Sequence, residues 1–148
     1  MENLNKLYWI KKEIKQIENL IKELTVLSAI SYSGMPSGNA VSSPVEKFNE
    51  RLDNLKRKLA IKHEESLAEE ERIEKYIETI DDVEIRVLAR ARFIECKSWQ
   101  KIGDENFMDR TTAYKKLNKY IRERNEVENN VQKSNKTEAQ RLQDIQAG

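Results

Sequence analysis

The sequence is poor in the residues that build metal centres, disulfide frameworks and nucleophilic active sites. It contains one histidine, His63, and one cysteine, Cys96. A single cysteine excludes an intramolecular disulfide and is typical of a protein in a reducing compartment. A lone histidine argues against a zinc site, and no nucleophile–base pair occurs at a recognisable spacing. We therefore expect no enzymatic activity and no bound cofactor or metal.

Glycine, proline and long apolar runs are also scarce. Only four glycines and two prolines occur among 148 residues, whereas charged residues make up 36%. Few helix breakers together with abundant Lys, Glu, Leu and Ile predict an all-α chain. No apolar run approaches the roughly 20 residues of a membrane-spanning helix, and lysines interrupt the N-terminal segment where a signal peptide has its apolar core. We expect a cytoplasmic protein without a membrane partner.

The net charge of +1 hides an uneven distribution of charge along the chain. Residues 86–124 contain 11 lysines and arginines against five acidic residues, whereas residues 44–80 contain eight against ten. A local basic excess is the electrostatic signature of a segment that meets nucleic acid. The sequence therefore predicts its nucleic-acid-binding part in the C-terminal half.

The N-terminal segment predicts a long helix over residues 4–30. Leucine and isoleucine recur from Leu7 to Leu24 with spacings that alternate between three and four residues, and Lys and Glu fill the other faces. This is a heptad seam. A seam this narrow needs a partner helix, from the same chain or from another copy.

A second long helix is predicted over residues 44–79, after a loop at residues 31–43 that holds two of the four glycines. The phrase Ser43-Pro44-Val45-Glu46 is a capping box with proline at the first helical position. A second heptad seam starts at Val45. We predict that residues 1–80 form an antiparallel coiled-coil hairpin that pairs chains into a homodimer or a higher oligomer.

The second seam weakens after Leu59. Lys62 and Ser66 occupy seam positions, and the apolar residues expected to take over are Leu67, Ile73, Ile77 and Ile80. The carboxylate run Glu69-Glu70-Glu71 is interpreted as a solvated helix face rather than a metal or acid–base site.

Three shorter helices are predicted over residues 81–97, 98–105 and 109–122. Asp81 or Asp82 starts the first, with Glu84 placed to close a capping box on Asp81. Ser98 and Asp109 start the other two, because their short side chains can accept from an unsatisfied first-turn N–H. These two helices around a tight turn have the outline of a helix-turn-helix, whose second helix enters the major groove of DNA.

The packing expected inside this unit follows from side-chain spacing. Trp99, Ile102 and Ala113 are spaced to form a small core between the two helices, and Leu117 is expected to seat the second helix on residues 81–97. Periodicity and charge alone leave two interpretations open. The basic helix either binds DNA or is a solvated helix of an ordinary bundle.

In the DNA-binding interpretation, threonines suit phosphates or thymine methyl groups, and arginines and lysines suit guanine edges or phosphates. Residues of the second helix would face DNA, and basic residues of the two preceding helices would meet phosphates. The candidate site residues are Arg110, Thr111, Thr112, Lys115, Lys116, Lys119 and Arg122, together with Lys101 and Arg92.

The run from Val83 to Gly103 resembles region four of the bacterial sigma factors. There an arginine-rich helix ends in a Phe/Tyr-x-Glu-x-x-Ser/Thr phrase, matched here by Phe93-Ile94-Glu95-Cys96-Lys97-Ser98, and leads into a Trp-x-x-Ile-Ala helix, matched by Trp99 to Gly103. The phrase Arg110-Thr111-Thr112-Ala113-Tyr114 is similar to the start of the recognition helix. The resemblance implies a sigma-like helix-turn-helix that binds double-stranded DNA, and contact with RNA polymerase.

The whole chain also resembles a family of small proteins of Gram-positive phages and prophages, grouped with the ArpU- and RinA-type transcriptional regulators. The likeness rests on the helix phrase Lys6-Leu7-Tyr8-Trp9-Ile10 and the loop phrase Gly34-Met35-Pro36 ahead of a sigma-like helix-turn-helix, over residues 6–122. It implies a phage-encoded regulator of transcription in the cytoplasm of a bacterial host.

The turn departs from the family pattern, which has Leu followed by Gly where this chain has Asn106 and Phe107. We expect Asn106 to adopt the left-handed conformation that the turn needs. Phe107 or Met108 is expected to replace the lost apolar contact. A shift of one residue in the turn would change which side chains of residues 109–122 face the bases.

Two other functions stay open at this point. A small terminase subunit of DNA packaging also joins a helix-turn-helix to oligomerising helices, although its DNA-binding unit usually comes first. Alternatively, the hairpin is a protein-interaction module and the chain does not bind DNA. The polar segment 123–148 is predicted to be frayed helix followed by disorder.

Overall fold

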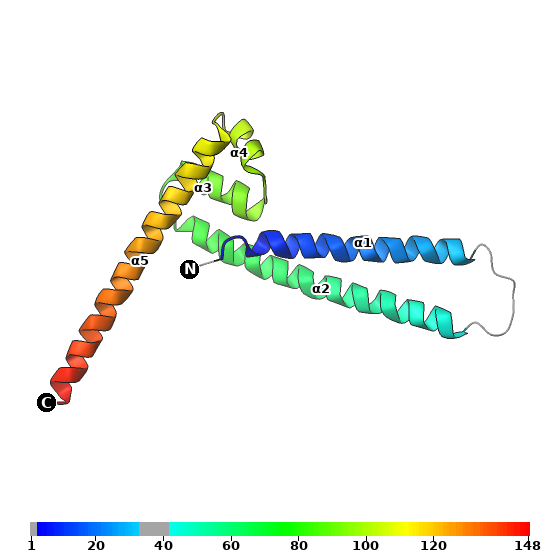
Figure 1. Ribbon diagram of the computed structural model, residues 1–148, viewed down its shortest axis with the longest axis horizontal. Coiled ribbons are helices and arrows are strands. Elements are labelled where there is room, and N and C mark those ends of the chain that lie inside the picture. The colour runs from blue at the N-terminus through cyan, green and yellow to red at the C-terminus, as the bar shows by residue number, and fades with distance from the viewer. Residues whose placement is uncertain (1–2, 33–41) are drawn as a thin grey trace. The chain divides into compact units, whose positions relative to one another are not determined.

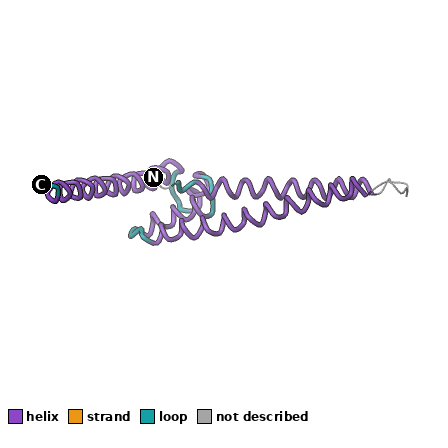
Figure 2. Tube along the Cα trace, turned by 90° about the horizontal axis from the view of Figure 1, so that it is seen from below, coloured by secondary structure: helices purple, strands orange, loops and turns teal. Residues whose placement is uncertain are grey.

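The computed structural model describes residues 3–32 and 42–148. These residues form five α-helices and one π-helical turn, η1, without a strand (Figures 1 and 2). The predicted all-α class is therefore confirmed. The elements are α1 (Lys6–Tyr32), α2 (Ser42–Glu78), α3 (Val83–Ala89), η1 (Arg90–Ile94), α4 (Trp99–Glu105) and α5 (Arg110–Gln146).

The chain forms two compact units, one of residues 4–76 and one made chiefly of residues 77–148. The loop predicted at residues 31–43 falls largely outside the described residues, and so does the Gly34-Met35-Pro36 phrase. Helix α2 begins at Ser42, one residue before the predicted cap. The Ser43 side chain, and with it the predicted capping box, lies outside the described side chains.

In the first unit, α1 and α2 lie side by side and run in opposite directions (Figure 1). Ion pairs link the start of α1 to the later part of α2. Lys6 Nζ lies 3.6 Å from Glu69 Oε2, and Lys62 Nζ lies 3.1 Å from Glu13 Oε2. Because the residue numbers of the partners rise on one helix as they fall on the other, these pairs record an antiparallel register.

The predicted seam of α1 is the buried face of that helix: Leu7, Ile10, Ile14 and Ile17 are all buried. On α2 the seam runs on after Leu59, with Lys62 and Ser66 at the predicted seam positions. It continues at the same spacing through half-buried Lys62 and buried Ser66, Glu69 and Ile73.

Leu67 and Glu69 reverse their predicted environments. Leu67 is 69% exposed, whereas Glu69 is only 5% exposed, so this member of the carboxylate run is not on a solvated face. Glu69 is buried with its charge compensated, because Arg72 Nη2 lies 2.6 Å from Glu69 Oε1 and Lys6 pairs with the other oxygen. The hydrogen bond from Arg72 is the main cause that lowers the pKa of Glu69.

The second unit has its own apolar core, to which every helical segment from the end of α2 onward contributes. The fully buried side chains are Ile77, Ile80, Leu88, Ala89, Ile102, Ala113 and Leu117. Helix α5 packs against both α3 and α4. Leu117 thus lies in the core where it was expected.

Helix α3 begins differently from the prediction. Asp82 Oδ1 accepts a hydrogen bond from the Ile85 N–H at 3.2 Å, so Asp82 is the cap. Glu84 does not close a capping box on Asp81. Its carboxylate instead pairs with Lys116 of α5 at 2.6 Å, because the first turn of α3 lies beside α5.

The helix predicted over residues 81–97 changes to a π-helical turn after Ala89 and ends at Ile94. Cys96 then adopts a left-handed conformation with φ of 55°. The Lys97 N–H donates to the Ala91 carbonyl at 3.0 Å, and Arg92 Nη1 donates to the Lys97 carbonyl at 2.9 Å. These bonds satisfy backbone groups at the helix end and redirect the chain toward α4.

Helix α5 corrects the prediction for the C-terminal segment. It does not end near residue 122 but continues to Gln146. No proline or glycine interrupts residues 110–146, which are rich in Glu, Lys, Arg and Gln, all good helix formers. Arg124 adds an ion pair to Glu128 at 3.2 Å. Helix propensity therefore outweighs the low hydrophobicity that suggested disorder.

Candidate functional site

The candidate site is built on α4, the turn after it and the first half of α5. Ser98 caps α4 as predicted, since its Oγ accepts from the Lys101 N–H at 3.3 Å. Gly103 lets α4 approach the start of α5 closely. A Cβ at this position would lie 2.5 Å from the Met108 carbonyl oxygen and 3.0 Å from the Arg110 nitrogen. The tight turn thus depends on the missing side chain of Gly103.

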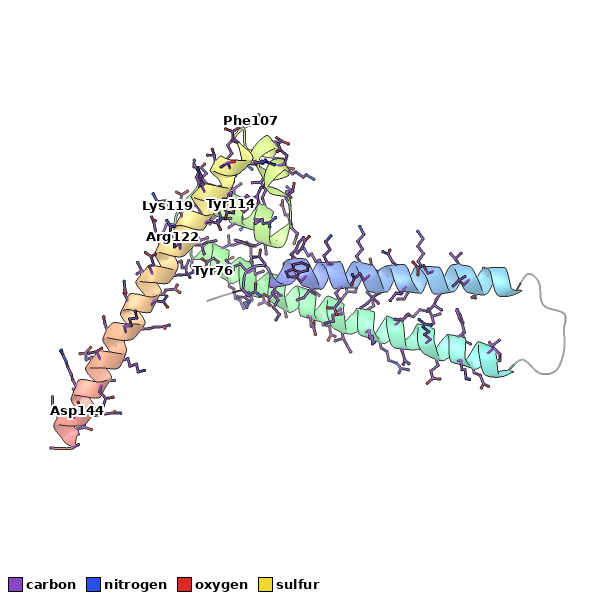
Figure 3. All side chains as sticks on the ribbon, in the orientation of Figure 1. Tyr76, Phe107, Tyr114, Lys119, Arg122 and Asp144 are labelled. Carbon is purple, nitrogen blue, oxygen red and sulfur yellow. The ribbon has the colours of Figure 1, made fainter. Side chains whose placement is uncertain are left out.

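The turn itself corrects the predicted conformation of Asn106. Asn106 has φ of −109°, and the left-handed residue is Phe107, with φ of 53°. Asn106 closes α4 instead, because its side-chain amide donates to the Ile102 carbonyl at 2.7 Å. Phe107 is 99% exposed and does not supply the predicted apolar contact, whereas Met108 is half-buried. Phe107 lies at the turn between the two helices (Figure 3).

Asp109 precedes α5 with an extended backbone but makes no capping hydrogen bond with its side chain, so its predicted role as a side-chain cap is wrong. The first turn of α5 also carries no acidic side chain. The positive end of the α5 dipole is therefore not neutralised by a carboxylate of its own first turn.

The inner face of α5 holds it against α4. Ala113 is fully buried, and Tyr114 packs edge to face with half-buried Trp99 at a centroid distance of 5.4 Å. Trp99 in turn carries the Arg92 guanidinium over its ring at 5.1 Å. Arg92 was predicted to meet phosphates, but its guanidinium contacts Trp99 and donates a hydrogen bond to the Lys97 carbonyl within the unit.

Lys97 joins the end of η1 to α4. Its Nζ lies 2.7 Å from Glu105 Oε2 and also pairs with Glu95. The hydrogen bond to Glu105, followed by that to Glu95, raises the pKa of Lys97. Lys97 therefore links the segment after η1 to α4 through its two ion pairs.

Lys116 and Lys119 also have carboxylate partners. Lys116 is tied to Glu84 of α3, and Lys119 Nζ lies 3.9 Å from Glu123 Oε1 within α5. Lys119 keeps most of its surface exposed and lies along the same edge of α5 as Arg122 (Figure 3). Of the two lysines, Lys116 forms the shorter ion pair, and its partner lies on a different helix.

The outward face of α5 carries a continuous polar row that we call the outer stripe: Thr111, Lys115, Asn118 and Arg122. The spacings of four, three and four residues place these side chains on one face, opposite buried Ala113 and Leu117. Asn118 is half-buried and the other three are exposed. Within the described residues none of the four side chains forms a hydrogen bond or an ion pair.

The remaining predicted residues lie around the start of α5. Lys101 on α4 and Arg110 and Thr112 on α5 are exposed. A shallow, open depression runs between the two helices. Its lining is mostly polar and consists of Gln100, Asp104, Met108, Asp109, Arg110, Thr111 and Thr112.

Asn118 is the one member of the outer stripe that sequence reasoning missed. The prediction selected cations and threonines by residue type, and an amide in a basic helix has no charge to draw attention. The spacing from Thr111 and Lys115 would have found it, because Asn118 follows at the next helical repeat.

No group of three or more His, Cys, Asp or Glu side chains that could hold a metal ion occurs in the described part of the chain. His63, on the other unit, is half-exposed and faces Glu18 at 3.9 Å. None of the described helices is both long and apolar enough to cross a membrane.

Comparison with family models, with curated proteins and with solved structures finds no match to this chain.

Proposed function

We propose that this chain is a sequence-specific DNA-binding regulator of transcription. In this proposal α4, the turn and α5 act as a helix-turn-helix, and α1 and α2 form a coiled-coil hairpin. The single observation that carries the proposal is the outer stripe. It offers two cations, a hydroxyl and an amide without partners in the fold, on a helix held rigidly by Gly103, Ala113 and Leu117.

The proposed mechanism places the first turns of α5 in the major groove. Thr111 and Lys115 lie near the N-terminal end of α5, the end that reads base edges in helix-turn-helix proteins. Arg122 lies about 10 Å further along the helix than Lys115, at 1.5 Å per residue. It would meet phosphates at the groove wall, as would Lys101 from α4.

We further propose that the chain is encoded by a phage, acts in the cytoplasm of a bacterial host and contacts RNA polymerase. These parts of the proposal rest on the resemblance to sigma region four and to the ArpU/RinA-type regulators. The arrangement of α3, α4 and α5 is consistent with that resemblance.

We also propose that the chain pairs with a second copy, so that two α5 helices meet two half-sites. The sequence predicts pairing through the hairpin, but α1 and α2 bury much of their apolar faces against each other. A better surface is the apolar row that we call the C-terminal stripe: Val127, Val131, Leu142 and Ile145, each more than half exposed. It continues the helix face that buries Ala113 and Leu117 nearer the start of α5.

The test is selection from a pool of random duplex DNA by the purified full chain, followed by binding titrations at several salt concentrations. We expect enrichment of a defined sequence, with affinity that falls steeply as salt rises. If no duplex shows salt-sensitive binding, the proposal is overturned. Mass measurement distinguishes the packaging alternative, which predicts a ring of many subunits.

A further inference from the structure

We propose that Asn118 determines sequence specificity by reading an adenine in the major groove. The inference rests on the proposed function, because it requires that α5 enters DNA. It goes beyond that function by naming a base and the residue that selects it.

The position of Asn118 supports a base contact. It lies in the outer stripe between Lys115 and Arg122, seven residues after Thr111 and on the same face. Seven residues correspond to about 10.5 Å along a helix, and successive base pairs are about 3.4 Å apart. Asn118 and Thr111 would therefore read base pairs about three steps apart.

The chemistry of the amide makes adenine its target. An asparagine side chain both donates and accepts, which matches the adenine N6 amino group and the N7 acceptor in a two-bond contact. Lys115 and Arg122 only donate, and that suits guanine or phosphate. Asn118 is also the one amide side chain between Arg110 and Arg122.

The fold gives no reason to keep asparagine at this position. Asparagine is a weaker helix former than alanine, and Asn118 forms no hydrogen bond within the described residues. It does not belong to the buried core of the unit. Asn118→Ala should therefore fold normally, with a thermal midpoint equal to or slightly above that of the wild type.

The experiment compares the full-length wild type with Asn118→Ala and with a matched control, Asn129→Ala. Asn129 is an exposed asparagine on the same helix, 11 residues further from the turn. Each protein selects its preferred sequence from a random duplex pool. We expect the wild type to require adenine at one position, Asn118→Ala to lose that single preference, and Asn129→Ala to match the wild type.

A chemical substitution in the DNA makes the test sharper. In the duplex selected by the wild type, the required adenine is replaced by 7-deazaadenine, which lacks the N7 acceptor. Wild-type affinity should fall about tenfold, whereas Asn118→Ala, already weaker by a similar factor, should lose little more. Affinity for random-sequence DNA should be the same for all three proteins.

The result has three informative outcomes. Loss of the adenine preference in Asn118→Ala alone, together with the non-additive 7-deazaadenine effect, supports the assignment. An unchanged preference in Asn118→Ala overturns it while leaving DNA binding intact. Failure of the wild type to bind any duplex overturns the proposed function and this inference together.

Discussion

Gly103 shows how a single residue sets the geometry of the candidate site. In an exposed helix, replacing glycine by alanine stabilises a protein by about 1 kcal/mol. Here the added methyl group would meet the Met108 carbonyl and the start of α5, which are rigid backbone groups. Backbone clashes of this kind cost more than the helix-propensity gain, commonly 1–3 kcal/mol or above.

We therefore predict that Gly103→Ala lowers the free energy of unfolding by about 1–2 kcal/mol, measured by chemical denaturation. Gly148→Ala is the control, because its added methyl group meets only the Asp144 carbonyl at an ordinary contact distance of 3.8 Å. An increase in stability for Gly103→Ala would show that α4 and α5 do not approach as closely as described.

Glu69 is a second residue whose role depends on its surroundings. Arg72, and to a smaller extent Lys6, lower the pKa of Glu69 from its ordinary value of 4.5. A carboxyl whose pKa is depressed by folding contributes stability above its unfolded pKa and loses it as pH falls through the folded pKa. The contribution of Glu69 is thus present at neutral pH and is lost below about pH 4.5.

The predicted consequence is a difference in acid sensitivity between the wild type and Glu69→Gln. The variant should be less stable than the wild type at pH 7, and the gap should narrow as pH falls from 4.5 toward 3. Denaturation curves recorded across this range measure the gap. Glu64→Gln serves as control, since Glu64 is an exposed carboxylate on the same helix and forms no ion pair within the described residues. A gap that is constant with pH would contradict the assigned environment of Glu69.

At the scale of the elements, α5 combines three roles along one helix. Its first half packs on α3 and α4 and presents the outer stripe, and its second half carries the C-terminal stripe on the face that is buried earlier. A long isolated helix gains little from propensity alone, since most helical stability in proteins comes from packing. A partner for the C-terminal stripe would supply that packing.

The pairing proposal predicts that Val131→Glu dissociates the oligomer. A charge in the C-terminal stripe must be desolvated or repelled when two copies meet. Asn129→Glu, which adds the same charge on another face of the same helix, should leave the oligomer intact. Sedimentation measures both. A wild type that sediments as a monomer, or a Val131→Glu variant that stays associated, would contradict pairing through this stripe.

Sequence reasoning was reliable where a pattern is local. The alternating spacing from Leu7 predicted the buried face of α1, and the position of Ser98 predicted the start of α4. It failed where the outcome depends on a distant partner. Glu69 is buried because Arg72 and Lys6 meet it, and Lys6 comes from another helix.

The turn and the C-terminal segment failed for related reasons. The left-handed residue is Phe107 rather than Asn106, because Asn106 is used to close α4. The close approach of α4 to the start of α5 at Gly103 is likewise a feature that spacing does not reveal. The low hydrophobicity of residues 123–146 suggested disorder, although the absence of proline and glycine from this segment was visible in the sequence.

For the whole molecule, the central claim is that the outer stripe of α5 is a DNA-binding surface. Lys115 and Lys116 provide a matched pair for testing it. They are adjacent, both exposed and of identical charge, yet Lys115 lies in the outer stripe and Lys116 is paired with Glu84 of α3. Net charge is therefore the same in the two alanine variants, and only the face of the helix differs.

The most direct measurement is the salt dependence of binding to the selected duplex by the wild type, Lys115→Ala and Lys116→Ala. We predict that Lys115→Ala weakens binding by about 1–3 kcal/mol if Lys115 reads a base, or lowers the salt slope by about one if it meets a phosphate. Lys116→Ala should lie close to the wild type. Equal losses in both variants, or a larger loss in Lys116→Ala, would contradict the claim that the outer stripe faces DNA.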